Sequence, residues 1–385
     1  MYNIKTIILS LLIVLLASSC ANHRLNYAPE HEKWNDNLPP SEKPKHTVYL
    51  IGDCGKSPKD GVGPAMYVLE EKLKKASKES TVIFLGDNIY PKGMPSKDDP
   101  KKRAYAEYQL DAQLRVLDEY KGNKIFIPGN HDWYDRGLEG LKRQEKYIQK
   151  KLNDGVEDKD EWEDYFLPDD GCSGPEVVEI NDQLVVLVID SQWWLENWDR
   201  SPEINSGCEA KSRFGFSFAF EEALRKHRSK NVIVALHHPL HSGGNHGGHF
   251  EAKHHLFPFT MVNSKAYIPL PIIGSIPPLL RATVGLDQDI SHPKYRELKA
   301  TLMRAAKKNG NFIFASAHDH SLQYFEKDGN RSYVIAQFFP RMAVYSDVEG
   351  WQNSQFWGRD EFALPFGDYE VNITVPADHI LDGTG

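Results

Sequence analysis

Short apolar runs that end abruptly in Asp, Asn or His recur along this chain from Thr47 onward. Six such runs occur, and stretches with helical character separate several of them. Continuous apolar runs of this length are typical of strands that are buried on both faces. Strands that alternate with helices predict an α/β fold. The runs lie at residues 48–51, 82–85, 125–127, 184–189, 232–236 and 312–315.

The polar residues stand just past the ends of these predicted strands. In open α/β sheets, ligands bind outside the carboxyl ends of the strands. Side chains at these positions are therefore expected to converge on one cleft. The residues concerned are Asp53, Asp87, Asn130, His237, His318 and His320.

This set of carboxylate, amide and imidazole donors suits hard or borderline ions such as Fe, Zn and Mn. It exceeds what one catalytic ion with an open position needs, and it suffices for two ions that share a carboxylate. Two ions about 3.5–4 Å apart can clamp the attacking and leaving oxygens of a displacement at phosphorus and lower the pKa of bound water. Taken singly, each Asp or Asn could instead form a turn or cap a helix. Their joint occurrence favours the metal site.

The order of these motifs resembles the calcineurin-like metallophosphoesterase superfamily, over residues 47 to about 325. The motifs are Gly52-Asp53, Gly86-Asp87-Asn88, Gly129-Asn130-His131-Asp132, His237-His238-Pro239 and His318-Asp319-His320. The resemblance implies a four-layer α/β/β/α sandwich with a dimetal site at the sheet edge. It also implies metal-dependent hydrolysis of phosphate esters.

Two departures from the superfamily pattern narrow the resemblance. The usual Asp-x-His of the first motif is Asp53-Cys54-Gly55 here, and Tyr90 follows Asp87 by three residues. This combination is similar to that of purple acid phosphatases, including the tartrate-resistant type. The resemblance implies phosphomonoester hydrolysis outside the cytoplasm.

The same resemblance implies a role for each motif residue. Fe(III) is expected at the first position, and Fe(II), Zn(II) or Mn(II) at the second, with a metal-bound hydroxide attacking phosphorus. The first ion would be held by Asp53, Asp87, Tyr90 and His320, and the second by Asp87, Asn130, His237 and His318.

Three further residues are expected on the substrate side. The resemblance implies that His131 steadies the phosphoryl oxygens or protonates the leaving group. Asp132 is interpreted as the partner that orients His131. His246 matches a second substrate-side histidine of the tartrate-resistant type. Two alternatives stay open: a phosphodiesterase or nucleotide hydrolase of the same fold, and a membrane-anchored, non-catalytic binding module.

The N-terminus reads as a targeting segment. Lys5 precedes an apolar run over 7–17, and Ser18-Ser19-Cys20 follows. The run is too short to span a bilayer and has the order of a secretory signal. It resembles a bacterial lipoprotein signal, which implies acylation of Cys20; the alternative is an ordinary signal peptide with an incidental cysteine. We expect a signal peptide over 1–19, a polar, lipid-anchored tether over 20–45 and the phosphoesterase domain over 46–380, on the periplasmic or cell-surface side.

Charge and the remaining cysteines add two expectations. The net charge of −8 argues against a nucleic-acid-binding surface, which normally carries a basic stripe. Cys172 and Cys208 both lie beside glycine in a chain bound for an oxidising compartment. They form either a disulfide or two unpaired thiols.

One segment, 266–286, is apolar and carries four prolines, which forbid a long regular helix. It is compatible with a lid, with a contact surface for a membrane or partner, and with buried irregular chain. The histidines that precede it, other than His246, are expected on an exposed rim of the cleft; they are His241, His249, His254 and His255.

Overall fold

The computed structural model describes residues 44–58, 63–196, 207–263, 265–310, 312–320, 322–327, 330–335, 344–346 and 350–352. The predicted signal peptide, Cys20 and almost all of the predicted tether lie outside the described residues. Within those residues, no helix combines the length and the apolar character that crossing a bilayer requires.

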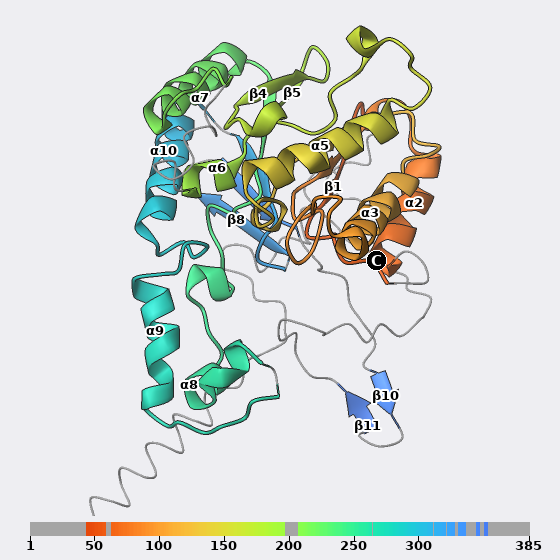
Figure 1. Cartoon of the computed structure of the whole chain (residues 1–385). Helices are drawn as coiled ribbons and strands as arrows, with labels where there is room; N and C mark the ends of the chain where they lie inside the picture. The colour runs from red at the N-terminus through yellow and green to blue at the C-terminus, as the bar shows by residue number, and fades with distance from the viewer. Residues whose placement is uncertain are drawn as a thin grey trace, which may run out of the picture.

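The N-terminal half forms a three-stranded parallel sheet in the order β1-β2-β3. Its helices α2, α3 and α5 gather on one outer side of the molecule (Figure 1). The bounds are β1 Thr47–Ile51, α2 Pro64–Lys75, β2 Ser80–Phe84, α3 Pro100–Arg115, β3 Asn123–Phe126, α4 Asn130–Trp133 and α5 Leu138–Leu152.

The C-terminal half forms a six-stranded sheet in the order β4-β5-β6-β7-β9-β8. Strands β5, β6, β7 and β9 are parallel, while β4 and β8 pair antiparallel with β5 and β9. The bounds are β4 Glu176–Glu179, β5 Leu184–Val188, α6 Ser191–Leu195, α7 Arg213–His227, β6 Asn231–Ala235, α10 Pro293–Asn309, β7 Ile313–Ser316, β8 Gln323–Lys327 and β9 Asn330–Val334. A separate pair, β10 Val344–Ser346 and β11 Gly350–Gln352, is antiparallel.

Side chains of the central strands alternate between the layer that lies between the two sheets and the layers between the sheets and the helices. Successive side chains of a strand point to opposite faces of its sheet. In β2, Ile83 belongs to a cluster between the sheets, whereas Phe84 packs toward the helices. In β5, Val186 faces the other sheet and Leu187 faces the helices. Both faces of both sheets are therefore buried, and the four-layer α/β/β/α prediction is confirmed.

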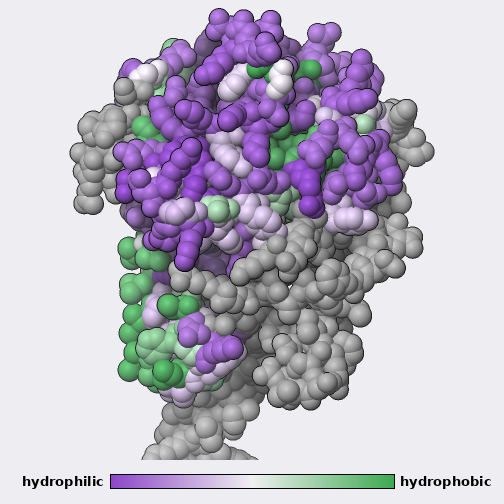
Figure 2. Space-filling view, turned by 45° about the vertical axis from the view of Figure 1, so that its right-hand side comes forward, coloured by the Kyte–Doolittle hydropathy of each residue, from purple (hydrophilic) through white to green (hydrophobic). Residues whose placement is uncertain are grey.

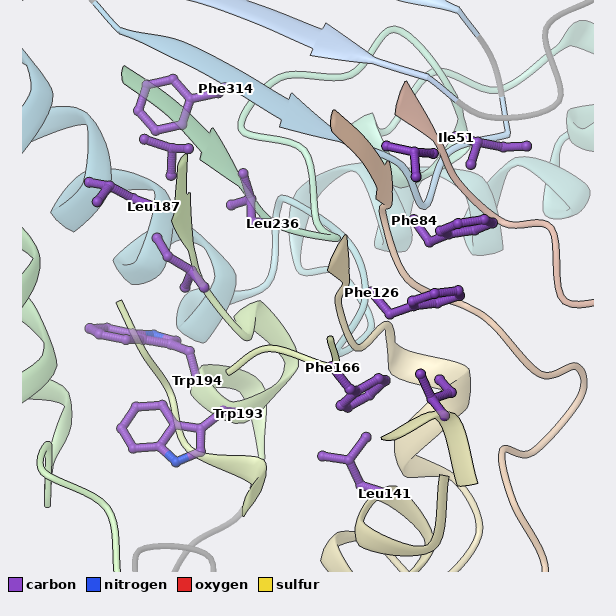
Figure 3. Close-up of a cluster of buried hydrophobic side chains, with 14 of the residues drawn as sticks. Ile51, Phe84, Phe126, Leu141, Phe166, Leu187, Trp193, Trp194, Leu236 and Phe314 are labelled. Carbon is purple, nitrogen blue, oxygen red and sulfur yellow. The ribbon is translucent and has the colours of Figure 1, made fainter. Parts of the chain in front are cut away.

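Large aromatic side chains fill the outer layers. The Phe84 and Phe126 rings stack with centroids 4.1 Å apart, and Phe166 and Leu141 lie close to them (Figure 3). On the other sheet, Trp193 and Trp194 of α6 are buried in the same cluster as Leu187 (Figure 3). These clusters hold the carboxyl ends of the strands in place.

A disulfide joins Cys172 to Cys208, with the two Cα atoms 5.4 Å apart. It connects the segment that precedes β4 to the segment that precedes α7. Cys54, the free cysteine of the described residues, is half-buried against the core, and its Sγ donates to Gln113 Oε1 at 3.3 Å.

A lobe formed by residues 252–286, here called the α9 lobe, stands beside the sandwich (Figure 1). It contains α8 Ala252–Leu256, η8 Pro258–Met261, η9 Ile273–Ser275 and α9 Ile276–Thr283. His254 is buried within it, contrary to the expectation of an exposed rim at that position. The lobe also exposes many apolar side chains, so that the predicted segment 266–286 is not buried irregular chain.

Candidate metal centre

Four of the predicted ligand residues adopt a left-handed backbone conformation. The φ angles are 56° at Asp53, 56° at Asp87, 71° at His318 and 44° at His320. Asp and His enter this region more readily than most other residues, although a positive φ remains uncommon outside glycine. At a strand end, the reversal turns the side chain out of the sheet and toward the cleft.

The first group of donor atoms surrounds the Tyr90 hydroxyl. This oxygen lies 2.9 Å from Asp53 Oδ1, 3.0 Å from Asp87 Oδ2 and 3.0 Å from His320 Nε2. Asp53 Oδ1 and His320 Nε2 are 3.4 Å apart. These four residues are those expected to hold the first ion.

The second group surrounds His237 Nε2. This nitrogen lies 3.0 Å from Asn130 Oδ1, 3.3 Å from His318 Nδ1 and 3.4 Å from Asp87 Oδ1. Asp87 therefore offers one carboxylate oxygen to each group. This is the arrangement expected of a carboxylate that bridges two ions.

Contacts behind the second group fix the orientation of its side chains. His237 Nδ1 donates to Leu85 O at 2.8 Å and His318 Nε2 donates to Gln288 O at 3.1 Å, since a carbonyl can only accept. The other nitrogen of each ring then faces the cleft. Asn130 Nδ2 donates to Tyr134 Oη at 2.7 Å, which leaves Asn130 Oδ1 toward the cleft.

Three acceptor atoms that face one another at 3.0–3.3 Å need a cation between them. Ligand atoms about 2.1 Å from one ion, at right angles to each other, lie about 3 Å apart. Asp53, Asp87 and His237 also bring one ligand atom each within 4.8 Å of one another. The donor set thus fits metal ions in both groups.

Two glycines allow the loops to approach so closely. Gly86 has φ 92°, and a Cβ there would lie 2.8 Å from His237 Nδ1. A Cβ on Gly129 would overlap the Asp87 backbone and carboxylate. The Asp87 carboxylate also accepts from His131 N at 2.9 Å through Oδ1. The Gly-Asp and Gly-Asn-His-Asp motifs are therefore packed directly against each other.

Burial and the neighbouring carboxylates of Asp53 and Asp87 hold the pKa of Tyr90 well above its ordinary value. Without a cation, the phenol keeps its proton. Burial alone would raise the pKa of Asp53, but the attraction of His320 outweighs it and lowers the pKa to about 2.

His131 stands at the edge of the centre, but Asp132 does not orient it. His131 Nδ1 contacts Pro91 O at 2.7 Å, so the ring is held by a carbonyl. The buried Asp132 carboxylate instead accepts from Gly129 N at 2.8 Å and from Asn88 N at 3.0 Å. The predicted role of Asp132 was wrong because its carboxylate satisfies the backbone N–H groups of two facing loops.

His246 has a partner that sequence reasoning missed. Its Nδ1 lies 3.0 Å from Oδ1 of Asp289, and its ring centroid lies 4.2 Å from that of His318. Asp289 is fully buried and also accepts from Arg281 Nε at 2.9 Å. The sequence around Asp289 carries no motif, and only the tertiary fold brings it beside His246.

His238, next to the predicted ligand His237, has a structural role. Its two ring nitrogens contact Ser191 Oγ at 2.7 Å and Gln288 Oε1 at 2.6 Å. Asp190 caps α6 by accepting from Trp193 N at 3.0 Å. The His238 contacts join Ser191 of α6 to the loop that contains Gln288. The backbone carbonyl of Gln288 in turn accepts from His318.

A comparison with known protein families shows which family the chain belongs to. Residues 46–267 match the model of the calcineurin-like phosphoesterase family. The chain belongs to this family. Calcineurin-like phosphoesterases use a dimetal centre, and the two donor groups described above are the candidate for it. Among curated proteins, none matches the sequence.

Three solved structures resemble this calcineurin-like phosphoesterase. GAP50, the anchor in the inner membrane complex of Plasmodium, is 14% identical with a TM-score of 0.40, covering 80% of this chain and 75% of its own. A protein described as a putative 5'-nucleotidase from Staphylococcus aureus is 13% identical with a TM-score of 0.38, covering 79% and 52%. The phosphopantetheinyl hydrolase from Mycobacterium tuberculosis is 13% identical with a TM-score of 0.35, covering 76% and 90%.

Proposed function

We propose that this calcineurin-like phosphoesterase hydrolyses phosphate monoesters with two metal ions, in the manner of a purple acid phosphatase. The observation that carries the proposal is the Tyr90 hydroxyl, which lies about 3 Å from donor atoms of Asp53, Asp87 and His320. A phenolate is a hard anionic donor that stabilises Fe(III). The residue two positions after Asp53 is Gly55 rather than the usual His, which also supports this subgroup.

The residues would divide between the ions as the two donor groups do. Asp53, Tyr90 and His320 would hold the first ion, expected to be Fe(III), and Asp87 would contact both. Asn130, His237 and His318 would hold the second ion, expected to be Fe(II), Zn(II) or Mn(II). Two such ions polarise phosphoryl oxygens and lower the pKa of water toward neutrality.

Two histidines would act on the substrate. The Pro91 carbonyl accepts from His131 Nδ1, so that His131 Nε2, 3.9 Å from Asp87 Oδ2, is the atom available to a phosphoryl or leaving-group oxygen. His246 is held through Nδ1 by Asp289, which leaves its Nε2 for the same task. Both side chains remain about a quarter exposed, as substrate access requires.

Export and anchoring belong to the same proposal. A signal peptide over 1–19 would direct the chain out of the cytoplasm, and an acyl group on Cys20 would tether the domain 46–380 through the segment 20–45. The disulfide between Cys172 and Cys208 supports this proposal, because such bonds persist in oxidising compartments. An intact mass that shows an unmodified Cys20 in the mature protein would refute the anchor.

Metal analysis combined with a substrate panel tests the catalytic proposal. Purified protein loaded with iron should hydrolyse phosphomonoesters much faster than phosphodiesters and should absorb in the visible through a phenolate-to-Fe(III) transition. A preference for diesters or nucleotides would favour a phosphodiesterase or nucleotide hydrolase of the same fold. Metal binding without turnover on any phosphate ester would favour a non-catalytic binding module.

A further inference from the structure

The α9 lobe carries most of the apolar surface that the described residues expose. Eleven of the nineteen exposed large apolar side chains come from residues 259–286. Ile272 is 89% exposed and Val262 is 86% exposed. Figure 2 shows the apolar surface gathered on this lobe, below a largely polar sandwich. Apolar patches of this extent mark interaction surfaces.

Helix α9 is arranged with its apolar side outward. Ile276, Leu279 and Leu280 follow the spacing of one helix face, and each is more than half exposed. The inward side of the helix holds the buried Pro278 and Arg281, whose guanidinium binds the buried Asp289. The polar contacts of α9 thus face the metal centre, and its apolar face meets solvent.

The tip of the lobe extends this face. Ile272 has φ 72°, a conformation that β-branched residues rarely adopt. The neighbouring Ile273 and Ile268 are also more than half exposed, and Tyr267 stands beside them, 55% exposed. Strained backbone that presents apolar side chains to solvent points to a binding role for the tip.

The charge of the lobe differs in sign from that of the chain. Residues 252–286 contain three basic residues and no Asp or Glu, whereas the chain as a whole carries −8. The basic residues are Lys253, Lys265 and Arg281. Arg281 is engaged by Asp289 on the inner side of α9, and Lys253 lies 3.7 Å from Glu251, so the exposed Lys265 is the basic residue on the lobe surface. An aliphatic face without carboxylates, with a lysine beside it, suits the interface of an anionic bilayer.

An acyl group on Cys20, as proposed above, would place a bilayer within reach of the domain. Residues 21–43 separate Cys20 from Pro44, where the described structure begins, and extend to about 80 Å at most. A tether of this length leaves the orientation of the domain open. A second contact with the membrane would set it.

We propose that the α9 lobe docks onto an anionic lipid bilayer, with the outer face of α9 and the tip around Ile272 in the interfacial region. Tyr267 would lie at the headgroup level, where aromatic rings with a polar end are favoured. Because Arg281 on the inner side of α9 connects through Asp289 to His246, docking turns the His246 side of the metal centre toward the membrane. The proposal goes beyond phosphomonoester hydrolysis; it rests on the anchor proposed at Cys20 to bring the domain to a bilayer, and the intact mass at Cys20 tests that anchor separately.

Fluorescence quenching in vesicles tests this orientation with the full, anchored chain. One probe is attached through Ile272→Cys on the lobe. The matched control probe is attached through Phe218→Cys on α7, because Phe218 is 69% exposed. The vesicles contain phosphatidylcholine and phosphatidylglycerol, with nitroxide-labelled lipid or aqueous iodide as quencher. The ratio of lipid to iodide quenching should be about tenfold higher at 272 than at 218. Adding Leu279→Ser and Leu280→Ser should remove that difference, and omitting phosphatidylglycerol should reduce it.

Equal ratios at the two probe positions would overturn the proposal. Shielding of the 272 probe from iodide without quenching by the lipid would assign the face to a second copy of the chain instead. A second probe position, Val284→Cys, repeats the test on another exposed part of the lobe. The Tm of every variant should be unchanged, which shows that the domain remains folded without reference to turnover and separates this test from that of the catalytic proposal.

Discussion

Asp289→Asn is expected to weaken both the stability of the fold and the action of His246. The Asp289 carboxylate is fully buried and accepts from Arg281 Nε at 2.9 Å and from Leu286 N at 2.9 Å. Burial alone would raise the pKa of Asp289, but the hydrogen bonds from Arg281 and His246 outweigh it and lower the pKa from 3.8 to about 2. The substitution keeps the volume of the side chain but removes its charge.

The lowering of the Asp289 pKa gives the size of the stability loss expected for Asp289→Asn. Each pKa unit corresponds to about 1.4 kcal/mol, and the partial exposure of Arg281 reduces the total through screening. We therefore expect Asp289→Asn to lower the free energy of unfolding by about 2 kcal/mol at pH 7, which corresponds to roughly 3 °C in Tm for a domain of this length. Because the pKa is depressed in the folded state, this contribution is present above about pH 4 and is lost as the pH falls toward 2.

Thermal unfolding of chelator-treated protein between pH 7 and pH 2 measures this contribution without interference from metal loss. Asp287→Asn is the matched control, since Asp287 is 71% exposed and pairs with His292 at 3.2 Å on the surface. The control should change Tm by less than about 1 °C. In metal-loaded enzyme, Asp289→Asn should lower kcat/KM about 10–100-fold with unchanged metal content. Equal behaviour of the two variants would refute the positioning of His246 by Asp289.

Three further substitutions test the metal centre and the disulfide. Tyr90→Phe should remove the visible absorption of the iron-loaded protein, and an unchanged band would exclude a phenolate ligand. His131→Ala should retain both metal ions and lower turnover roughly 10²–10⁴-fold; loss of metal would identify His131 as a ligand instead. Replacing Cys172 and Cys208 with Ser should cost about 2–4 kcal/mol of stability, and a reducing agent should lower the Tm of the wild-type protein alone.

The core strands could be predicted because burial on both faces leaves a continuous apolar run. Residues 184–189 and 232–236 correspond to β5 and β6. The edge strand β4 was missed, since its sequence EVVE alternates between half-buried and exposed residues. The hairpin β8–β9 was also missed, and it follows directly after the motif residues His318 and His320.

The site was predictable where its residues follow strand ends, and unpredictable where they do not. Asp53, Asp87 and His237 stand at strand ends, and the structure brings them together. Asp289 and Gln288 approach the site from a loop that leads into α10, and no local pattern distinguishes them from surface residues. Asp132 misled the prediction because the N–H groups it binds belong to two loops that only the tertiary fold brings face to face.

The α9 lobe shows a different limit of sequence reasoning. Its apolar composition is compatible both with a buried core and with an exposed binding face, because composition does not reveal what covers a side chain. Four prolines removed the helical periodicity that could have separated these cases, and only the eight residues of α9 form a regular helix within 266–286. In the structure, the side chains of Ile272, Leu279 and Leu280 are exposed.

The backbone at the metal centre connects the packing of the core to the chemistry. The left-handed conformations of Asp53, Asp87, His318 and His320 are costly, of the order of 1 kcal/mol or more each, and persist only where the surroundings impose them. Here the surroundings are the parallel strands, held by buried rings such as Phe84 and Phe126. The core thus sets the donor atoms about 3 Å apart, the spacing that ligand atoms of one ion adopt. Substitutions in this core should therefore weaken metal affinity, although the core side chains lie outside the two donor groups.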